Sequence, residues 1–492
     1  MDPENHVATS LNMDIMHIVM SFADRRAVSS LMKTCSTLNS EGAKYILTDG
    51  VFLRHERGLM SFIWFLIARN GSSECRRRLT FLKKLSLDFY PPTEVAAGIL
   101  EGFFELVPVT SGLICLEISE AEALLAMHPP LGVAIAKLTR LKTLNLSDAG
   151  EHCALLLRTL RSSLVFADIT FVTSNGEPED EATRRSNANP ILLLEGSQST
   201  LESLSTNFAT SSPDGPRYTN VTSLTLMYID LLVIEDYIRA FPNVRTLSSS
   251  ECSGFREDRE RWEDRRATSM LHQARHGTWR SLRHYVGTVL DLWTFGLACQ
   301  IRTVGFGVPQ NRMVQDPDML NDVLSDARPS ALDLMLPGAS YLLDEALRSV
   351  LSVERGLREL DLRVLLHING NDEIVSVGDV LDLLVDVVRA SAVAAFRLKL
   401  DMSWIRDVRT RAERSGEEGP PIMPFEVYLQ DMDVDAYTDA LLAKVASLRE
   451  VQVSVVWPGD GRTRQADRKR TERVGGSPTS ALDGSSVDGD SV

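Results

Sequence analysis

The sequence has 492 residues, a formal net charge of −15 and 44% hydrophobic residues. That length allows roughly three average domains and a sizeable hydrophobic core. The negative charge argues against nonspecific nucleic-acid binding as the main activity, because phosphate contacts need clustered Lys and Arg.

The sequence is predicted to carry no secretory signal and no membrane-spanning helix. The first ten residues, MDPENHVATS, carry no basic stretch followed by an apolar run, so no secretory signal is predicted. No run reaches the roughly eighteen apolar residues that a membrane-spanning helix requires. The six cysteines lie far apart with no CxxC pair, which favours reduced thiols over disulfides or a metal site. We therefore expect a cytoplasmic or nuclear protein with no membrane partner.

The first predicted element is a helix at about 13–22 that is apolar almost all the way round. Its polar residues before Ala23 are Asp14, His17 and Ser21. They are spaced i, i+3 and i+7, so they form one narrow stripe. A surface helix normally has a limited apolar stripe and a wide polar face. This helix therefore needs cover on two sides.

Two further helices are predicted at about 26–33 and 35–47. In chain order, residues 11–38 carry a Leu, a helix with paired aliphatic residues, a Phe, another Leu, and a third helix that opens with Cys-x-x-Leu. This pattern resembles an F-box, although Asn12 stands where a Pro usually follows the first Leu. The matching residues are Leu11, Ile15, Ile18, Phe22, Val28, Leu31, Cys35 and Leu38.

The resemblance implies an F-box at 9–50 that binds a Skp-type adaptor, and through it a cullin and a RING protein. These eight residues would be the adaptor-binding residues, and Cys35 would be buried in the F-box core. One side of the first helix would meet the adaptor and the other its own repeat domain. The chain would then be the non-catalytic substrate receptor of an SCF-type ubiquitin ligase. The open alternative is a helical cap on a stand-alone repeat scaffold for protein–protein interaction.

A short pattern then recurs along 51–457: apolar, two residues, apolar, one residue, apolar. Its average spacing is about 28 residues, inside the ~20–29 of leucine-rich repeats. The alternation predicts strands, and helical segments between the copies predict an α/β fold: an irregular leucine-rich-repeat-like β/α solenoid. An ordinary α/β domain is the alternative. The central positions are Leu85, Leu116, Leu144, Ala167, Leu204, Leu224, Leu247, Tyr285, Val304, Leu334, Leu360, Leu398, Phe425 and Val451.

The last segment, 458–492, is rich in Gly, Ser, Asp and Arg, and we predict a disordered tail. Its basic stretch RTRQADRKRTER is interpreted as ordinary tail charge, with a nuclear-import signal or a nucleic-acid contact as the alternative.

No catalytic motif such as GxxxxGK[ST], GxSxG or HExxH is present, so we predict no enzyme activity, no cofactor and no metal site. Residues that flank the core positions of each strand point away from the core. In the later repeats they are large and charged, which suits the recognition of a protein substrate. The predicted substrate-binding residues are Glu359, Asp361, Arg363, Arg397, Lys399, Asp401, Glu426 and Tyr428.

Overall fold

In the computed structural model the chain divides into two units, Met1–Pro329 and Ser330–Val492. The alternation of strands and helices predicted from the sequence is present in both. The structure describes residues 12–67, 71–107, 112–172, 186–229, 232–252, 259–307, 316–353, 356–366, 376–416, 419, 421–457 and 463–470.

The sheet of the first unit is parallel, and its strands lie side by side in chain order. The central leucines are in register from strand to strand, so Leu85 pairs with Leu116 and Leu116 with Leu144. Each central leucine is buried, because it forms the core between the sheet and the helices. The strands are β1 (Val51–Leu53), β2 (Lys84–Leu87), β3 (Cys115–Ile118), β4 (Thr143–Ala149), β5 (Phe166–Phe171), β6 (Ser203–Asn207), β7 (Ser223–Met227), β8 (Thr246–Ser250), β9 (His284–Gly287) and β10 (Thr303–Phe306).

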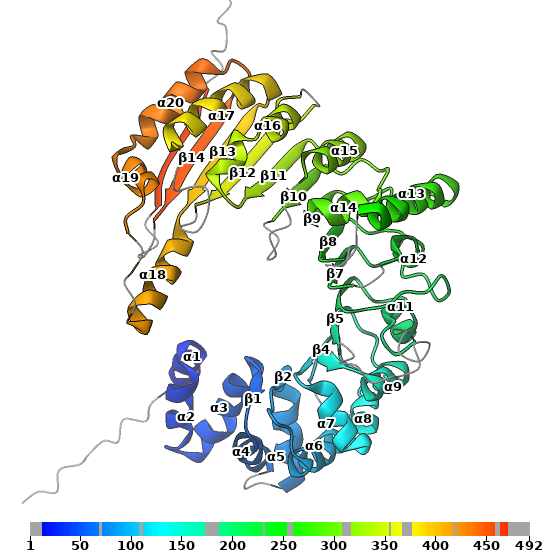
Figure 1. The fold of residues 1–492 in the computed structure, drawn as a ribbon. Coiled ribbons are helices and arrows are strands. Elements are labelled where there is room, and N and C mark those ends of the chain that lie inside the picture. The colour runs from blue at the N-terminus through cyan, green and yellow to red at the C-terminus, as the bar shows by residue number, and fades with distance from the viewer. Residues whose placement is uncertain are drawn as a thin grey trace, which may run out of the picture. The chain divides into compact units, whose positions relative to one another are not determined.

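Three helices precede this sheet in the chain. The later helices, which connect its strands, cover one of its faces (Figure 1). The helices of the first unit are α1 (Met13–Phe22), α2 (Arg25–Met32), α3 (Ser36–Thr48), α4 (Glu56–Ile67), α5 (Gly71–Phe81), α6 (Glu94–Leu106), α7 (Ala121–Met127), α8 (Pro129–Ala136), α9 (Glu151–Thr159), α11 (Pro190–Leu193), α12 (Ile234–Ala240), α13 (Arg259–His276), α14 (Val289–Phe295) and α15 (Pro317–Ala327), with a 3₁₀ turn at Glu195–Ser197.

A left-handed backbone turn recurs where strands of the first unit end. Five residues, each four positions after a central leucine, have φ between 50° and 58°. This is an unusual conformation for non-glycine residues, and its recurrence at one position shows that these repeats share one turn geometry. The next residue is buried in each case, which explains why an apolar residue can stand where a leucine-rich repeat usually has Asn or Cys. The five residues are Glu120, Asp148, Phe208, Tyr228 and Glu251.

The second unit has strands β11 (Ala331–Leu336), β12 (Glu359–Leu365), β13 (Ala395–Asp401), β14 (Glu450–Val456) and β15 (Thr463–Lys469). The first four pair in parallel, and β15 pairs antiparallel to β14. Helices α17 (Val377–Ser391) and α20 (Val434–Lys444) lie over one face of this sheet (Figure 1). The helices are α16 (Glu345–Ser352), α17 (Val377–Ser391), α18 (Ser403–Ser415), α19 (Pro424–Asp431) and α20 (Val434–Lys444), with a 3₁₀ turn at Ala339–Leu343.

Two predictions about the second unit are wrong. The apolar pattern centred on Phe425 lies in helix α19, not in a strand. Pro424 starts that helix, and the Glu426 carboxylate accepts a hydrogen bond from the Met423 N–H (2.9 Å), which caps it. The predicted disordered tail also contains an ordered strand, β15, because its backbone pairs with the edge of β14.

Candidate functional site

Helix α1 begins at an N-cap that the resemblance to an F-box did not predict. The Asn12 side chain accepts a hydrogen bond from the Asp14 N–H (2.9 Å). Asn is among the preferred N-cap residues, because its side-chain oxygen satisfies an N–H that has no partner within the helix. Asn12 therefore sets the start of α1 where a Pro was expected. Leu11, the first predicted adaptor-binding residue, lies outside the described residues.

One face of α1, which we call the α1 outer face, consists of four exposed apolar side chains. Ile15 is 55% exposed, Ile18 59%, Val19 45% and Phe22 87%. Covering a side chain of this kind contributes about 1.5–3 kcal/mol, so leaving four together in water is unfavourable. Exposed apolar patches are typical of surfaces that bind another protein. The site residues predicted from sequence omitted Val19, although it lies four positions after Ile15 and so on the same face.

The opposite face of α1 is buried within the helical segment itself. Met16 and Met20 are buried, and the His17 Nδ1 lies 3.3 Å from the Tyr45 hydroxyl of α3. Helix α1 packs against α3. The sequence predicts that the repeat domain covers this face of α1. In the structure α3 packs there.

The other predicted adaptor-binding residues do not extend the α1 outer face evenly. Val28 and Leu38 are buried, Leu31 is half-buried and Cys35 is exposed. Val28 and Leu38 therefore support the helices and do not offer a surface in this chain. The expectation that Cys35 is buried is wrong. It is the N-cap of α3, where its Sγ accepts from the Leu38 N–H (3.5 Å).

Helices α2 and α3 approach each other closely at Gly42. A Cβ atom on Gly42 would lie 2.3 Å from Met32 Cγ, closer than any real contact. The close approach requires glycine at this position, and it fixes α2, which follows α1 directly, against α3.

Arg77 and Arg78 of α5 fasten α3 to the first repeat. The Arg77 guanidinium bonds to the Glu41 carboxylate (2.5 Å), and Arg78, only 3% exposed, donates to Asn39 Oδ1 (2.9 Å). Arg78 also donates to the Phe65 carbonyl oxygen at the end of α4. No sequence pattern points to a buried role for these residues, because an Arg-rich helix end usually indicates solvent exposure.

In the second unit, six of the eight predicted substrate-binding residues lie on β12 and β13. Asp361 is in register with Arg397, and their Oδ2 and Nη1 atoms are 3.0 Å apart. Arg363 and Lys399 are also in register, and both contact the Asp401 carboxylate, at 2.5 and 3.3 Å. The sixth residue, Glu359, lies 4.0 Å from Arg397. These charges largely neutralise one another on the strands.

The remaining two predicted residues lie away from these strands on α19, since the strand predicted there is a helix. Glu426 is buried and forms a two-pronged ion pair with Arg409, at 2.8 and 2.9 Å. Tyr428 is exposed. Glu426 therefore holds α18 and α19 together, which is a structural role.

We predict that the Asp401 carboxylate makes the second unit sensitive to acid. Burial would raise its pKa, but hydrogen bonds from Ser403 and Arg363 and the charge of Lys399 lower the pKa to about 2. Because the folded pKa lies below its ordinary value of 3.8, the stabilisation is complete above about pH 4 and disappears as pH falls toward 2. Asp401→Asn should flatten the loss of thermal stability between these pH values, whereas Asp386→Asn, on an exposed ion pair, should not. Equal acid sensitivity in all three proteins would contradict this assignment.

Two other kinds of site are not found among the described residues. In that part of the chain, no group of three His, Cys, Asp or Glu side chains is placed to hold a metal ion. None of its helices is long and apolar enough to cross a membrane.

The α1 outer face is thus the most exposed apolar feature of helices α1, α2 and α3. The charged face of β12 and β13 is a second surface, and its charges pair with one another.

Comparison with protein-family models and with curated proteins finds no match for this chain.

Proposed function

We propose that the chain is a non-catalytic substrate receptor of a cullin-RING ubiquitin ligase, and that its α1 outer face binds a Skp-type adaptor. The observation that carries the proposal is the four exposed apolar side chains of α1, on a helix whose other face is already packed against α3. They include Ile15, Ile18 and Phe22 of the F-box-like pattern. The leucine-rich-repeat-like region, interpreted as a solenoid, would hold the protein substrate.

The contacts that hold the three N-terminal helices against the first repeat also support the proposal. Arg77 and Arg78 join α5 to α3, and α1 and α2 pack against α3, so an adaptor bound to α1 would be held near the first repeat. A receptor acts by raising the effective concentration of its substrate near the charged conjugating enzyme. That role needs a stiff connection and no catalytic group. The charged face of β12 and β13 is our proposed substrate surface.

The test is co-purification of the full chain with a Skp-type adaptor, using exposed residues so that folding is preserved. We expect Ile18→Asp to abolish recovery of the adaptor, because it places a charge in an apolar interface. The matched control is Val95→Asp on α6, since Val95 is 61% exposed and Ile18 is 59% exposed. Phe22→Ser should reduce affinity by roughly tenfold to a hundredfold, the equivalent of one buried apolar side chain.

Two outcomes would oppose the proposal. If a folded wild-type chain does not bind the adaptor, the α1 outer face has another partner, and the chain is a repeat scaffold for protein–protein interaction. If adaptor binds equally to wild type and Ile18→Asp, the site lies elsewhere on the chain.

A further inference from the structure

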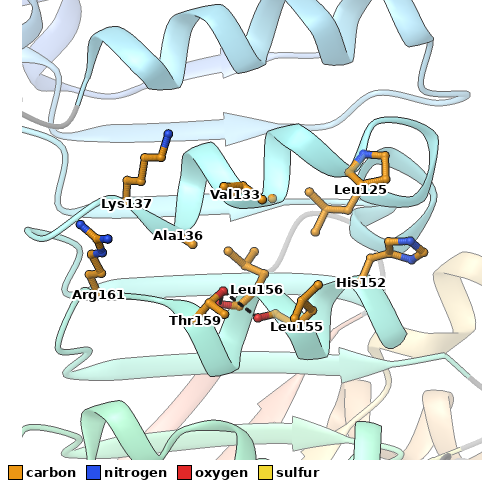
Figure 2. Close-up of a pocket in the computed structure, with 11 residues that line it drawn as sticks. Leu125, Val133, Ala136, Lys137, His152, Leu155, Leu156, Thr159 and Arg161 are labelled. Atoms are coloured by element: carbon orange, nitrogen blue, oxygen red, sulfur yellow. Dashed lines mark hydrogen bonds between the residues drawn. The ribbon is translucent and has the colours of Figure 1, made fainter.

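A groove of about 280 Å³ lies between α8 and α9, outside the proposed adaptor and substrate surfaces (Figure 2). Leu125 and Leu156 are buried at its floor. Val133 of α8 and Leu155 of α9 stand at its rims and are 58% and 57% exposed. Together with the buried leucines, these two exposed side chains make the lining of the groove mainly aliphatic.

The groove exists because small residues stand on the facing side of α8. Gly132 and Ala136 line it, and a Cβ added to Gly132 would meet only a Leu125 methyl carbon, at 3.7 Å. On α9, the Thr159 hydroxyl donates to the Leu155 carbonyl (2.8 Å), so its hydrogen-bonding capacity is used within its own helix (Figure 2). The space is therefore apolar and open to a side chain larger than those that border it.

The two ends of the groove differ in charge. Lys137 and Arg161 lie at the end where α8 and α9 terminate, and His152 lies at the other (Figure 2). Lys137 pairs with Glu105 (2.6 Å), and both side chains of that pair are well exposed. The exposed Arg161 side chain forms no ion pair with any residue that the structure describes. Among the described residues, the carboxyl end of the groove therefore offers a positive charge with no paired carboxylate, beside apolar walls.

We propose that this groove is a docking site for a short amphipathic helix of another protein, one that carries two aliphatic side chains followed by an acidic residue. The groove walls are helices whose backbone groups are bonded internally, so they offer no N–H or C=O edge to an extended strand. An occupant must satisfy its own backbone, as a helix does. Leucines at i and i+4 with a third residue at i+7 span about 10.5 Å along a helix, which fits the roughly 12 Å length of the eight-residue α8. A glutamate one turn further on would reach Arg161.

The experiment uses the purified full chain and a defined probe: a fluorescein-labelled, Ala/Gln-based helical peptide with Leu at i and i+4 and Glu at i+7. Binding is measured by fluorescence anisotropy beside a peptide in which the Glu is Lys. We expect saturable binding of the Glu peptide, with at least about tenfold weaker binding of the Lys peptide. Arg161→Glu should reverse this preference, whereas Arg280→Glu, at an exposed arginine outside the groove, should leave it unchanged.

A groove-filling variant separates loss of the site from loss of folding. Gly132→Leu should abolish binding while the thermal midpoint stays equal or rises, because Leu is a better helix former than Gly. Adaptor recovery should be unaffected, so this proposal and the proposed function fail independently. The proposal is overturned if the Glu peptide does not bind up to about 1 mM, or binds Gly132→Leu as well as wild type. Saturable binding of dodecanoate without binding of either peptide would also overturn it, in favour of a small amphiphile.

Discussion

Replacing Arg78 by alanine is expected to loosen α1, α2 and α3 from the first repeat. The buried Arg78 guanidinium donates to Asn39 Oδ1 on α3 and to the Phe65 carbonyl on α4, and it lies over the Phe65 ring at 4.6 Å. The Phe65 carbonyl belongs to the last turn of α4 that the structure describes, near a helix end where carbonyl groups need donors from elsewhere. Asn39 in turn donates to the Met32 carbonyl (3.2 Å), so this one arginine is linked through α3 to α2.

The size of the effect follows from the bonds that are lost. Hydrogen bonds from a charged group contribute about 1.5–3 kcal/mol each, and a buried acceptor left without a donor costs more than the bond itself contributed. We therefore expect Arg78→Ala to lower the free energy of local unfolding of the three helices by about 3 kcal/mol. Amide hydrogen exchange across residues 13–48 would then accelerate by about a hundredfold.

The neighbouring Arg76 provides a matched control, since it is exposed and on the same helix. Arg76→Ala should leave the exchange rates of residues 13–48 unchanged. Arg78→Lys should give an intermediate rate, because lysine keeps the charge but cannot make the same fork of hydrogen bonds or stack as well on Phe65. Unchanged exchange in Arg78→Ala would mean that α3 is held by apolar packing alone.

The strands could be predicted from the sequence because a parallel sheet buried on one face leaves an alternating apolar pattern. Central positions such as Leu116 and Leu224 have buried side chains on strands, as the pattern requires. The same pattern failed at Phe425, because only the central one of its three apolar residues is buried, whereas Ile422 and Val427 are exposed. There Phe425 and Leu429, four residues apart, are both buried on α19.

The strand β15 was missed for a different physical reason. Of its seven residues only Ala466 is buried, so its sequence carries almost no apolar signal. It is held by its backbone pairing with β14 and by Arg468, whose guanidinium bonds to Asp435 (2.5 Å) and Asp439 (2.8 Å) of α20. A charged edge strand of this kind also protects a sheet from pairing with other chains, which polar composition alone does not reveal.

The site at α1 was easier to predict in outline than in detail. A helix that is apolar almost all the way round is expected to be covered on two sides, but the sequence does not say which side packs against this chain itself. That depends on which residues face inward: Met16 and Met20 are buried, whereas Ile15 and Ile18 are exposed. The anchoring role of Arg78 depends on three helices meeting, which no local pattern encodes.

Replacing Glu122 by alanine is expected to destabilise the junction between two successive repeats. The N-cap of helix α9 is Gly150, which has no side chain and so cannot cap the helix itself. Its free N–H groups are satisfied instead by Glu122 of α7, which accepts from the N–H groups of Gly150 (2.9 Å), His152 (2.9 Å) and Cys153 (3.1 Å). A Cβ on Gly150 would lie 2.7 Å from Glu122 Cδ, so glycine is needed for this approach.

The Glu122 carboxylate also bonds to His152 Nδ1 (2.8 Å), and its pKa reflects all these donors. Burial would raise the pKa, but the hydrogen bonds from His152, Cys153 and Gly150 hold it below the ordinary 4.5. A folded pKa below the unfolded one means that Glu122 stabilises the fold above about pH 4.5 and loses that contribution as pH falls through the folded value.

We expect Glu122→Ala to lower the free energy of local unfolding around α9 by about 3 kcal/mol, since it leaves three N–H groups without an acceptor. Hydrogen exchange of residues 151–159 at neutral pH measures this directly, and the difference from wild type should shrink as the pH is lowered below 4.5, the ordinary pKa of a glutamate. The control is Glu151→Ala, which removes an exposed carboxylate from the first turn of the same helix and should cost at most about 1 kcal/mol. If both substitutions had equal effects, the charge near the helix end would matter and the capping bonds would not. A larger effect of Glu122→Ala would show that a carboxylate from one repeat caps the helix of the next, which couples the two repeats.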